Sequence, residues 1–204
     1  MIGKPIAVFF SLAMLSPILT ANADEATVSI VMITSQGEIG IDLYLEKAPV
    51  TAGNFLQLVE GEHLDGGRFY RVVTYENDHG KPQIEVIQGG LGGEGESPFP
   101  PIDHETTKQT GILHTDGVIS MARGDIGTAS SEFFICVGDQ PGLDYGAVRN
   151  PDEQGFAAFG KVVSGMDVVR RINQSPADGP TDSEYTLGQI LSEPVTILSV
   201  RRTD

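Results

Sequence analysis

Arg71 is a residue whose type could take part in catalysis without a cofactor. It lies in the apolar and aromatic run Phe69-Tyr70-Arg71-Val72-Val73. A guanidinium stays charged at every relevant pH and carries several fixed N–H donors. It can stabilise an electron pair that develops in a transition state and is absent from the ground state. Taken alone, an arginine in a strand is more often a solvated or ion-paired surface residue, so the rest of the sequence has to decide.

A glycine-rich string offers a second chemistry that its surroundings do not support. Gly90-Leu91-Gly92-Gly93-Glu94-Gly95 matches the G-x-G-x-x-G pattern of dinucleotide-binding proteins and follows a predicted strand. The segment that comes next, Glu96-Ser97-Pro98-Phe99-Pro100-Pro101, is not a helix. No helix N-terminus is therefore present to hold a pyrophosphate, and Glu94 and Glu96 would repel it. We expect no dinucleotide site.

Metal and nucleophile chemistry also lack support. The single cysteine, Cys136, lies in the apolar run Phe133-Phe134-Ile135-Cys136-Val137, where a buried small hydrophobe is the better interpretation. There is no G-x-S-x-G nucleophile elbow. We expect no metal, no cofactor and no hydrolase chemistry. The four histidines are scattered without ligand spacing: His63, His79, His104 and His114.

The elements that would position Arg71 are mostly short strands. Alternation from Thr27 onward predicts an opening β-hairpin that turns at Ser35-Gln36-Gly37. The strands are separated by stretches rich in Gly, Pro, Asp and Asn, which favours a closed or nearly closed antiparallel sheet. The further strands are predicted over residues 69–74, 84–88, 118–122, 133–137 and 195–200.

Two short helices are predicted beside the sheet. After Pro49, Thr51 can cap a helix that Gly61 ends. A second amphipathic helix is predicted from Met166 to about Asn173. No long repeat or shift in composition marks a second domain.

The N-terminal segment has the pattern of a secretory signal peptide. Lys4 is followed by an apolar run from Ile6 to Leu19 and then by Ala21-Asn22-Ala23. The run contains Pro17 and is too short to span a bilayer comfortably. We therefore predict a signal peptide over residues 1–23, cleavage after Ala23, one domain over residues 24–204 and no membrane anchor after cleavage. The predicted location is the periplasm or the extracellular medium.

The acidic charge of the chain limits its partners. The formal net charge is −15 over 204 residues, so nucleic acid and anionic membrane surfaces would be repelled. Mutual repulsion mildly favours a monomer. With a single cysteine no intramolecular disulfide can form, so an exported chain of this kind must rely on its hydrophobic core.

Several ordered segments resemble the cyclophilin family of peptidyl-prolyl cis/trans isomerases, in its bacterial, exported form. They include Phe69-Tyr70-Arg71-Val72-Val73, Ile87-Gln88-Gly89-Gly90, and Ile119-Ser120-Met121-Ala122-Arg123 leading to Ser131-Glu132-Phe133-Phe134-Ile135. The resemblance extends from about Val28 to Val200. It implies an eight-stranded antiparallel closed barrel capped by two α-helices, and isomerisation of X-Pro bonds during the folding of exported proteins.

The resemblance also assigns roles to particular residues. It implies that Arg71 is the catalytic arginine and that Gln88 contacts the substrate backbone. Phe134 and Leu143 would form walls of the proline pocket, and Phe156 stands where many relatives carry a histidine. The short strand that pairs with the bound peptide would be formed by Ala122 and Arg123. The implied partners are proline-containing polypeptides.

The chemistry of proline isomerisation suits an arginine. Rotation about a peptide C–N bond has a barrier of about 18–20 kcal/mol because the twisted amide loses its resonance. In the twisted state the proline nitrogen regains a lone pair. The Arg71 guanidinium can hydrogen-bond to that lone pair far better than to the planar ground-state nitrogen.

The chain departs from the family pattern around the pocket. An insertion over residues 75–82 precedes Glu85-Val86, which replace a Phe-Met pair of many relatives, so Tyr75 could serve as a substitute wall. Glu132 replaces a usual glutamine. A second insertion, over residues 148–155, lengthens the loop before Phe156. Gly142 stands where some members have a tryptophan, which predicts weak binding of the cyclic peptide drug that many eukaryotic relatives bind.

These departures leave other functions open. The barrel could be a catalytically weak module or chaperone that binds proline-containing segments. A more distant alternative is an unrelated acidic β-barrel that binds a small ligand. The retained Arg71, Gln88 and Phe134 favour the isomerase, whereas the changes at Glu85, Glu132 and Phe156 favour the binding module.

Overall fold

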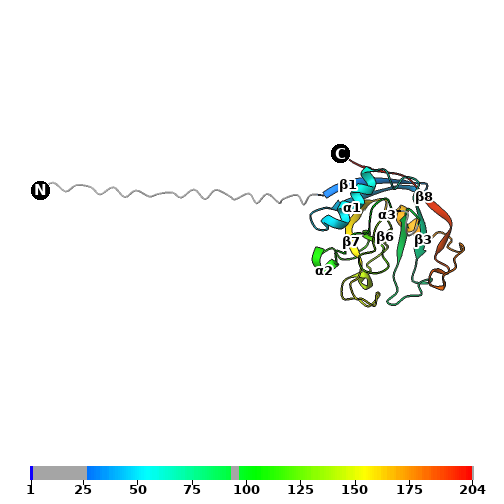
Figure 1. Cartoon of the computed structure of the whole chain (residues 1–204). Helices are drawn as coiled ribbons and strands as arrows, with labels where there is room; N and C mark the ends of the chain where they lie inside the picture. Colours follow the sequence, from blue (N-terminus) through cyan, green and yellow to red (C-terminus); the bar gives the residue numbers. More distant parts are fainter. Residues whose placement is uncertain (2–26, 93–96, 204) are drawn as a thin grey trace.

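The structure of the chain, a computed structural model, describes Met1, residues 27–92 and residues 97–203. Its strands form a closed antiparallel barrel in the order β1-β2-β7-β5-β6-β4-β3-β8 (Figure 1). This confirms the predicted mostly-β fold. Apart from Met1, the predicted signal peptide over residues 1–23 lies outside the described residues. The strands are β1 (Thr27–Thr34), β2 (Gly37–Tyr44), β3 (Arg68–Val73), β4 (Val86–Gly90), β5 (Val118–Met121), β6 (Phe133–Cys136), β7 (Ala157–Ser164) and β8 (Ile190–Arg202).

The barrel core is built by side chains that alternate between interior and solvent. In β1, Ile30 and Met32 are buried while Val31 between them is partly exposed. Four phenylalanine rings meet in the interior: Phe55 lies 5.3 Å from Phe133 and 5.1 Å from Phe159, and Phe69 lies 5.6 Å from Phe133, measured between ring centroids. Such contacts add to the stabilisation that burial of the rings provides.

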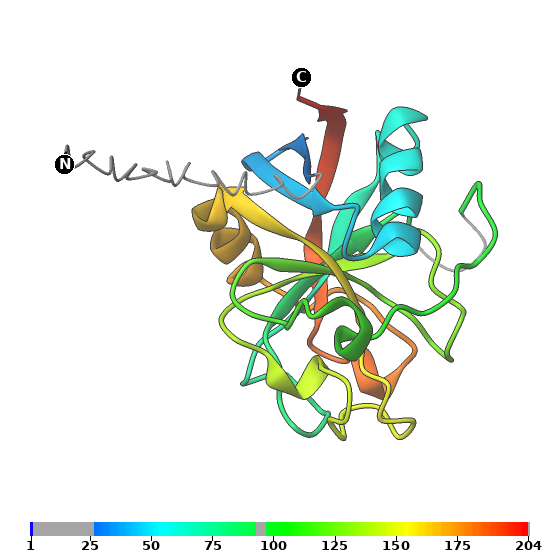
Figure 2. The ribbon, with the colours of Figure 1, turned by 90° about the vertical axis from the view of Figure 1, so that its left-hand side faces the viewer.

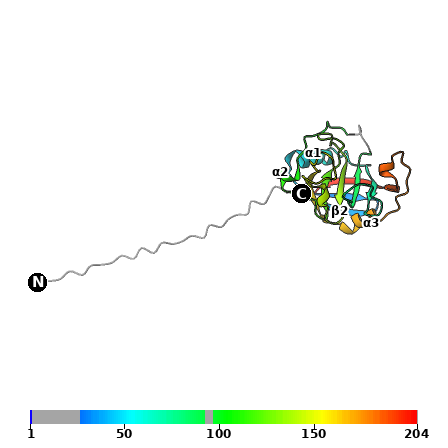
Figure 3. The same ribbon diagram turned by 90° about the horizontal axis from the view of Figure 1, so that it is seen from below.

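Two longer helices lie on opposite sides of the barrel (Figure 3). Helix α1 (Pro49–Glu60) packs against β2, β7 and β8, and helix α3 (Met166–Asn173) packs against β2, β3 and β4. The predicted helices are therefore confirmed. The structure adds the one-turn helix α2 (Thr107–Thr110) and two 3₁₀ turns, η1 (Pro141–Leu143) and η2 (Glu184–Thr186). None of the helices in the described part of the chain has the length and apolarity needed to cross a bilayer.

The predicted capping of α1 by Thr51 is wrong. The helix begins at Pro49, with Ala48 as its N-cap residue, and Thr51 lies inside its first turn. The Glu105 carboxylate instead accepts hydrogen bonds from the backbone N–H groups of Val50 (3.2 Å) and Thr51 (2.7 Å) and from the Thr51 hydroxyl (2.7 Å). A carboxylate distant in sequence thus satisfies the helix N-terminus, which no local pattern reveals.

The observed strands differ from the predicted ones at β4, β7 and β8. Residues 157–160 of β7 are all buried, so they show no alternation, and the strand was not predicted from periodicity. Strand β4 begins at Val86 rather than at residue 84, because the preceding insertion forms a loop. Strand β8 begins at Ile190 and is longer than predicted.

Three long loops gather at one end of the barrel. They contain the insertion over residues 75–82, the segment over residues 140–156 and the segment before β8 that includes η2. Figure 2 shows them at the lower end of the view, opposite the C-terminus. This end of the barrel carries the pocket described next.

Candidate active site

A pocket opens between β3, β4, β6 and the loops at this end of the barrel. Its volume of about 160 Å³ is smaller than the ~300–1,000 Å³ of sites that hold whole drug-sized ligands. The size therefore suits a single small ring or side chain. The lining residues are Arg71, Val73, Ile84, Val86, Gln88, Ala122, Arg123, Phe134, Leu143, Arg149, Asn150, Phe156 and Tyr185.

The floor of the pocket is an apolar cluster separate from the main barrel core, which we call the apolar cup. It consists of Val73, Ile84, Val86, Phe134, Cys136 and Leu143, with Ala122 and Phe156 packed against it. The rings of Phe134 and Phe156 meet edge to face, 5.3 Å between centroids. Cys136 is fully buried, and burial raises the pKa of its thiol. The prediction that Cys136 is a buried packing residue is therefore confirmed.

A buried histidine supports the Phe134 wall from beneath. The His114 ring stacks on Phe134 with 5.9 Å between centroids. Its Nδ1 lies 2.8 Å from the Asp144 carboxylate and its Nε2 lies 3.0 Å from the Ser120 hydroxyl. The arrangement has the order of a Ser-His-Asp triad, but Ser120 and His114 are buried at 0% and 1% exposure. A substrate cannot reach Ser120, so the three residues hold Phe134 in place. Within the described ranges, no cluster of histidine, cysteine and carboxylate side chains could hold a metal ion.

Arg71 lies at the edge of the cup and is held by two glutamines. Its Nε and Nη2 donate to the side-chain oxygen of Gln189 at 2.9 and 2.6 Å, and its Nη1 donates to the side-chain oxygen of Gln88 at 2.9 Å. The guanidinium also lies over the Tyr185 ring, 5.2 Å from its centroid. A guanidinium has five N–H donors, so these three hydrogen bonds leave donors for a substrate.

A chain of hydrogen bonds runs from Arg71 across the strands to Glu132. The Gln88 amide donates to the Tyr70 hydroxyl at 2.9 Å, and that hydroxyl donates to the Glu132 carboxylate at 2.6 Å. Burial, and next the charge of Glu132, raise the pKa of Tyr70 well above its ordinary value of 10.0. An ionised carboxylate can only accept hydrogen bonds. Glu132 therefore fixes which group donates and which accepts in each hydrogen bond of this network. Glu132, which stands in place of the family's usual glutamine, thus orients Gln88 toward Arg71.

Arg123 fastens the second insertion to the pocket rim. Its Nη1 and Nη2 donate to the Asp152 carboxylate at 2.8 and 2.9 Å, and its Nε and Nη2 donate to the backbone oxygen of Gly155 at 3.0 and 2.7 Å. The guanidinium lies 5.3 Å from the centroid of the Phe156 ring. Ala122 follows β5 and donates its backbone N–H to the carbonyl of Glu132.

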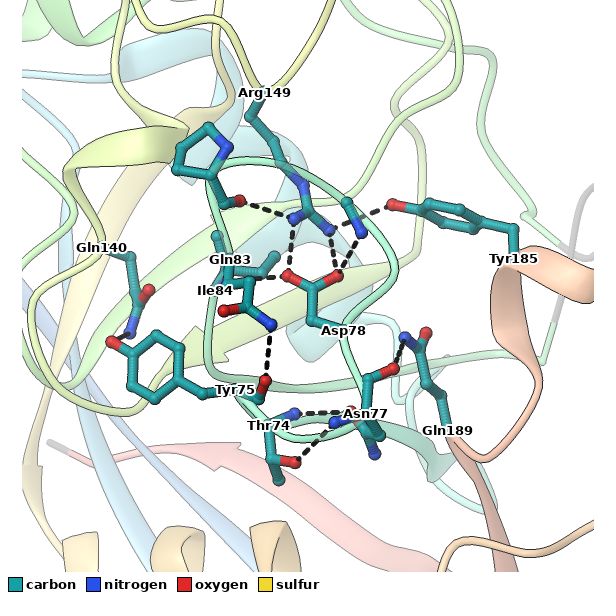
Figure 4. A network of polar contacts seen from close by, with 12 residues as sticks. Thr74, Tyr75, Asn77, Asp78, Gln83, Ile84, Gln140, Arg149, Tyr185 and Gln189 are labelled. Atoms are coloured by element: carbon teal, nitrogen blue, oxygen red, sulfur yellow. Dashed lines mark hydrogen bonds and ion pairs between the residues drawn. The ribbon is translucent and has the colours of Figure 1, made fainter.

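A buried ion pair ties the two insertions together (Figure 4). Two nitrogens of the Arg149 guanidinium donate to the Asp78 carboxylate at 2.6 and 2.8 Å, and the two side chains are 4% and 0% exposed. The same guanidinium donates to the Pro82 carbonyl at 2.7 Å and to the Tyr185 hydroxyl at 3.2 Å. Asp78 also accepts from the backbone N–H of Ile84 at 2.7 Å. One ion pair therefore joins three chain segments at the pocket wall.

The aromatic wall is not supplied by Tyr75, so that expectation is wrong. Tyr75 is exposed, and its hydroxyl accepts a hydrogen bond from Gln140 at 3.3 Å, outside the pocket lining (Figure 4). Tyr185, which comes from the loop before β8, lines the pocket instead. Of the two residues that replace the Phe-Met pair, Val86 lines the cup and Glu85 does not, because side chains alternate along the strand.

The first insertion also fills the space beside Gly142. A methyl group at position 142 would lie 2.5 Å from Cγ of the Pro82 ring. We expect Gly142→Ala to lower the free energy of unfolding by about 1–3 kcal/mol, because the proline ring has to move. Chemical denaturation measures the change. Gly53→Ala in α1 is the control, since its methyl group meets nothing within 4 Å, and it should stabilise by about 0.5–1 kcal/mol. A Gly142→Ala chain as stable as the unmodified one would show that Pro82 does not fill this space.

All the residues assigned from the sequence lie in one place. The structure brings Arg71, Gln88, Ala122, Arg123, Phe134, Leu143 and Phe156 into the lining of this pocket. Sequence reasoning missed Arg149, Tyr185 and Gln189, which lie in loops without recognisable motifs. A weak signal existed for the first of these, because Arg149 and Asp78 each lie inside an insertion.

The fold and the pocket together define a class of protein: a closed barrel that presents an arginine beside an apolar cup sized for one ring. A family model described as cyclophilin type peptidyl-prolyl cis-trans isomerase/CLD matches residues 29–202. A peptidyl-prolyl cis-trans isomerase of Acinetobacter baylyi is 33% identical over 179 residues, covering 86% of both chains. Peptidyl-prolyl cis-trans isomerase A of Dickeya dadantii is 32% identical over 199 residues, covering 96% of this chain and 94% of that one.

Solved structures agree on the fold. A cyclophilin type isomerase of Cryptosporidium parvum superposes with a TM-score of 0.65 at 18% identity, covering 87% of this chain and 98% of that one. A second crystal structure of that protein, obtained in the presence of the dipeptide Ala-Pro, gives a TM-score of 0.65 at 19% identity, covering 86% of this chain and 99% of that one. This chain belongs to the cyclophilin-type peptidyl-prolyl cis-trans isomerase family and is an enzyme of that activity.

Proposed function

We propose that the chain is an exported isomerase that accelerates rotation about X-Pro bonds in other exported proteins, with Arg71 as its catalytic residue. The observation that carries the assignment is the placement of Arg71, whose guanidinium lines the pocket beside the apolar cup and is held there by uncharged partners. A slow X-Pro rotation can limit the rate of folding. A catalyst of that step suits proteins that fold after export.

The geometry supports a mechanism without bond breaking. The proline ring would seat in the cup against Phe134 and Leu143, while Gln88 and the Ala122-Arg123 segment hold the substrate backbone. As the amide twists, its nitrogen gains a lone pair, and an N–H group of Arg71 donates to it. The guanidinium is fixed before the reaction, so little reorganisation is needed when the lone pair forms.

Proline-containing polypeptides are the substrates that the pocket fits. Its small volume suits a pyrrolidine ring, and the related Cryptosporidium parvum protein was crystallised in the presence of Ala-Pro. The net charge of −15 disfavours nucleic acid and anionic membrane surfaces, and mutual repulsion favours a monomer. These features support a single barrel that acts on peptide segments.

The isomerase assay that tests this proposal uses residues 24–204 and several X-Pro peptides. We expect the barrel to accelerate the cis-to-trans exchange in a protease-coupled assay, and to bind the same peptides in a titration followed by NMR. Acceleration together with binding supports the enzyme. Binding without acceleration would overturn the proposed catalytic role and identify a proline-segment binder on the same fold.

Export is supported by the charged, apolar and small-residue order of residues 1–23. We expect the full chain, expressed in a Gram-negative host, to be recovered from the periplasm with Asp24 as its first residue. Osmotic-shock fractionation and N-terminal sequencing measure both points. Leu12→Arg is the matched control, because a charge in the apolar run should keep the chain in the cytoplasm. Recovery of the unmodified chain in the cytoplasm with its N-terminus uncleaved would contradict export.

A further inference from the structure

The three arginines that line the pocket are held in two different ways. Arg123 and Arg149 are each paired by two hydrogen bonds to a carboxylate, that of Asp152 and of Asp78 respectively. Arg71 is different: among the residues that the structure describes, no carboxylate lies within ion-pair distance of it, and its partners are amide oxygens and an aromatic ring. The arginine assigned to catalysis is therefore the one whose charge is not neutralised by a neighbour.

Gln189 makes the larger share of the contacts that hold Arg71. Its side-chain oxygen accepts from both Nε (2.9 Å) and Nη2 (2.6 Å) of the guanidinium. The residue is completely buried, directly before β8.

The side-chain amide, the backbone N–H and the backbone carbonyl of Gln189 each make a hydrogen bond as well. Its side-chain amide donates to the Asn77 carbonyl at 2.7 Å. Its backbone N–H donates to Thr186, and its backbone carbonyl accepts from Val72 beside Arg71. The acceptor oxygen is thus fixed relative to the strand that carries Arg71.

A neutral acceptor serves this arginine better than a carboxylate would. A carboxylate at the same distance would hold the guanidinium but would oppose its field at the proline nitrogen, in surroundings where charges interact strongly. An amide oxygen fixes the orientation through two hydrogen bonds and leaves the positive charge available. Orientation matters because a displacement of about 1 Å in a catalytic group can cost about a hundredfold in rate.

We propose that Gln189 is a positioning residue of this isomerase, which fixes the Arg71 guanidinium through an uncharged clamp; the inference rests on the proposed catalytic role of Arg71. The Gln189 side chain would not touch the substrate. Its loss should therefore reduce turnover through Arg71 and leave peptide affinity almost unchanged.

The test is a double-mutant cycle on residues 24–204, with Gln189→Met, Arg71→Ala and the combined variant. Methionine keeps the length of the side chain and removes the acceptor. We expect Gln189→Met to lower the turnover of an Ala-Pro peptide by about tenfold to a hundredfold and to change its dissociation constant by less than about threefold. In the Arg71→Ala background the same change should cause no further loss, because a positioning residue acts only through its partner. Exchange spectroscopy by NMR at high enzyme concentration measures the slow variants.

The Nε–H resonances of the arginines give a readout that a general structural role would not move. In Gln189→Met the Arg71 Nε–H signal should broaden or exchange faster with water. The Arg123 signal is the internal control, because its Nε–H donates to Gly155 and should not change. If Gln189→Met does not fold, Gln189→Glu is measured instead: it keeps an acceptor, so the Arg71 signal should persist while turnover falls by about tenfold.

The outcomes separate this inference from the proposed function. The positioning role of Gln189 would be overturned if Gln189→Met or Gln189→Glu kept full turnover. It would also be overturned if Gln189→Met lowered turnover equally in the presence and in the absence of Arg71. If Arg71→Ala itself keeps full turnover, the catalytic role of Arg71 fails, and the inference fails with it. If Arg71→Ala is inactive and Gln189→Met is fully active, only the role of Gln189 is wrong.

Discussion

Replacing Arg71 with alanine is expected to lower kcat/KM for X-Pro peptides by about a hundredfold to a thousandfold, because the donor aimed at the developing lone pair is lost. The barrel should stay folded, since Arg71 lies at the rim of the cup and outside the hydrophobic core clusters. Protease-coupled kinetics give the rate, and circular dichroism with thermal unfolding confirms the fold.

Two further substitutions test whether the loss of rate depends on the Arg71 guanidinium itself. Arg68→Ala removes an exposed arginine from the same strand, β3, and should leave the rate unchanged. Arg71→Lys keeps the charge but loses the planar fork that contacts Gln189 and Gln88, so it should recover only a small part of the rate. A folded Arg71→Ala variant with the unmodified rate would show that catalysis does not depend on this guanidinium.

Replacing Asp78 with asparagine is expected to lower the free energy of unfolding by about 3–5 kcal/mol, because it leaves the buried Arg149 guanidinium without its counter-ion. Asparagine keeps the shape of the side chain, so the loss reports the charge and not a cavity. Urea denaturation followed by circular dichroism measures the change. The pocket wall should loosen as well, since Arg149 also holds the Tyr185 hydroxyl.

An exposed ion pair provides the matched control for this loss. Nη1 of Arg202 lies 3.6 Å from Oε1 of Glu60, and the two side chains are 52% and 53% exposed. Glu60→Gln should therefore change stability by less than about 1 kcal/mol. Equal effects of Asp78→Asn and Glu60→Gln would contradict the role assigned to the buried pair.

The same pair gives stability a pH dependence with a defined sign. Burial raises the pKa of the Asp78 carboxyl, but the hydrogen bonds from Arg149, Gly80 and Ile84, together with the Arg149 charge, outweigh burial and hold the pKa below its ordinary value of 3.8. The contribution of the pair is therefore complete above the unfolded pKa and is lost as the pH falls from 3.8 through the lower folded pKa. Below that range the difference between the unmodified chain and Asp78→Asn should shrink.

The sequence predicted the barrel and the pocket well wherever short-range patterns carry the information. Arg71 and Gln88 lie in short apolar runs, and Phe134 lies in a strand with clear β propensity. The resemblance then placed these residues in a single site, and the structure brings them together there.

The remaining features depend on contacts between segments that are distant in sequence. Gln189 meets Arg71 although 118 positions separate them, and Arg149 meets Asp78 across 71 positions. Their immediate neighbours show no pattern that predicts a partner. Thr51 was assigned as a helix cap because local rules favour it, whereas the distant Glu105 satisfies that helix end. Tertiary contacts decide such cases.

Because of the Asp78–Arg149 ion pair, the two inserted loops can be exchanged between related proteins only together. A chimera that receives the shorter first connection of a relative would keep Arg149 without Asp78, and one that loses only the second loop would bury Asp78 without Arg149. Each single graft should therefore fold poorly, while the joint graft removes both charges. To build this pocket on another cyclophilin barrel, residues 75–82 and 148–155 have to be transferred together. Tyr185 has to be transferred with them, because its hydroxyl accepts a hydrogen bond from Arg149.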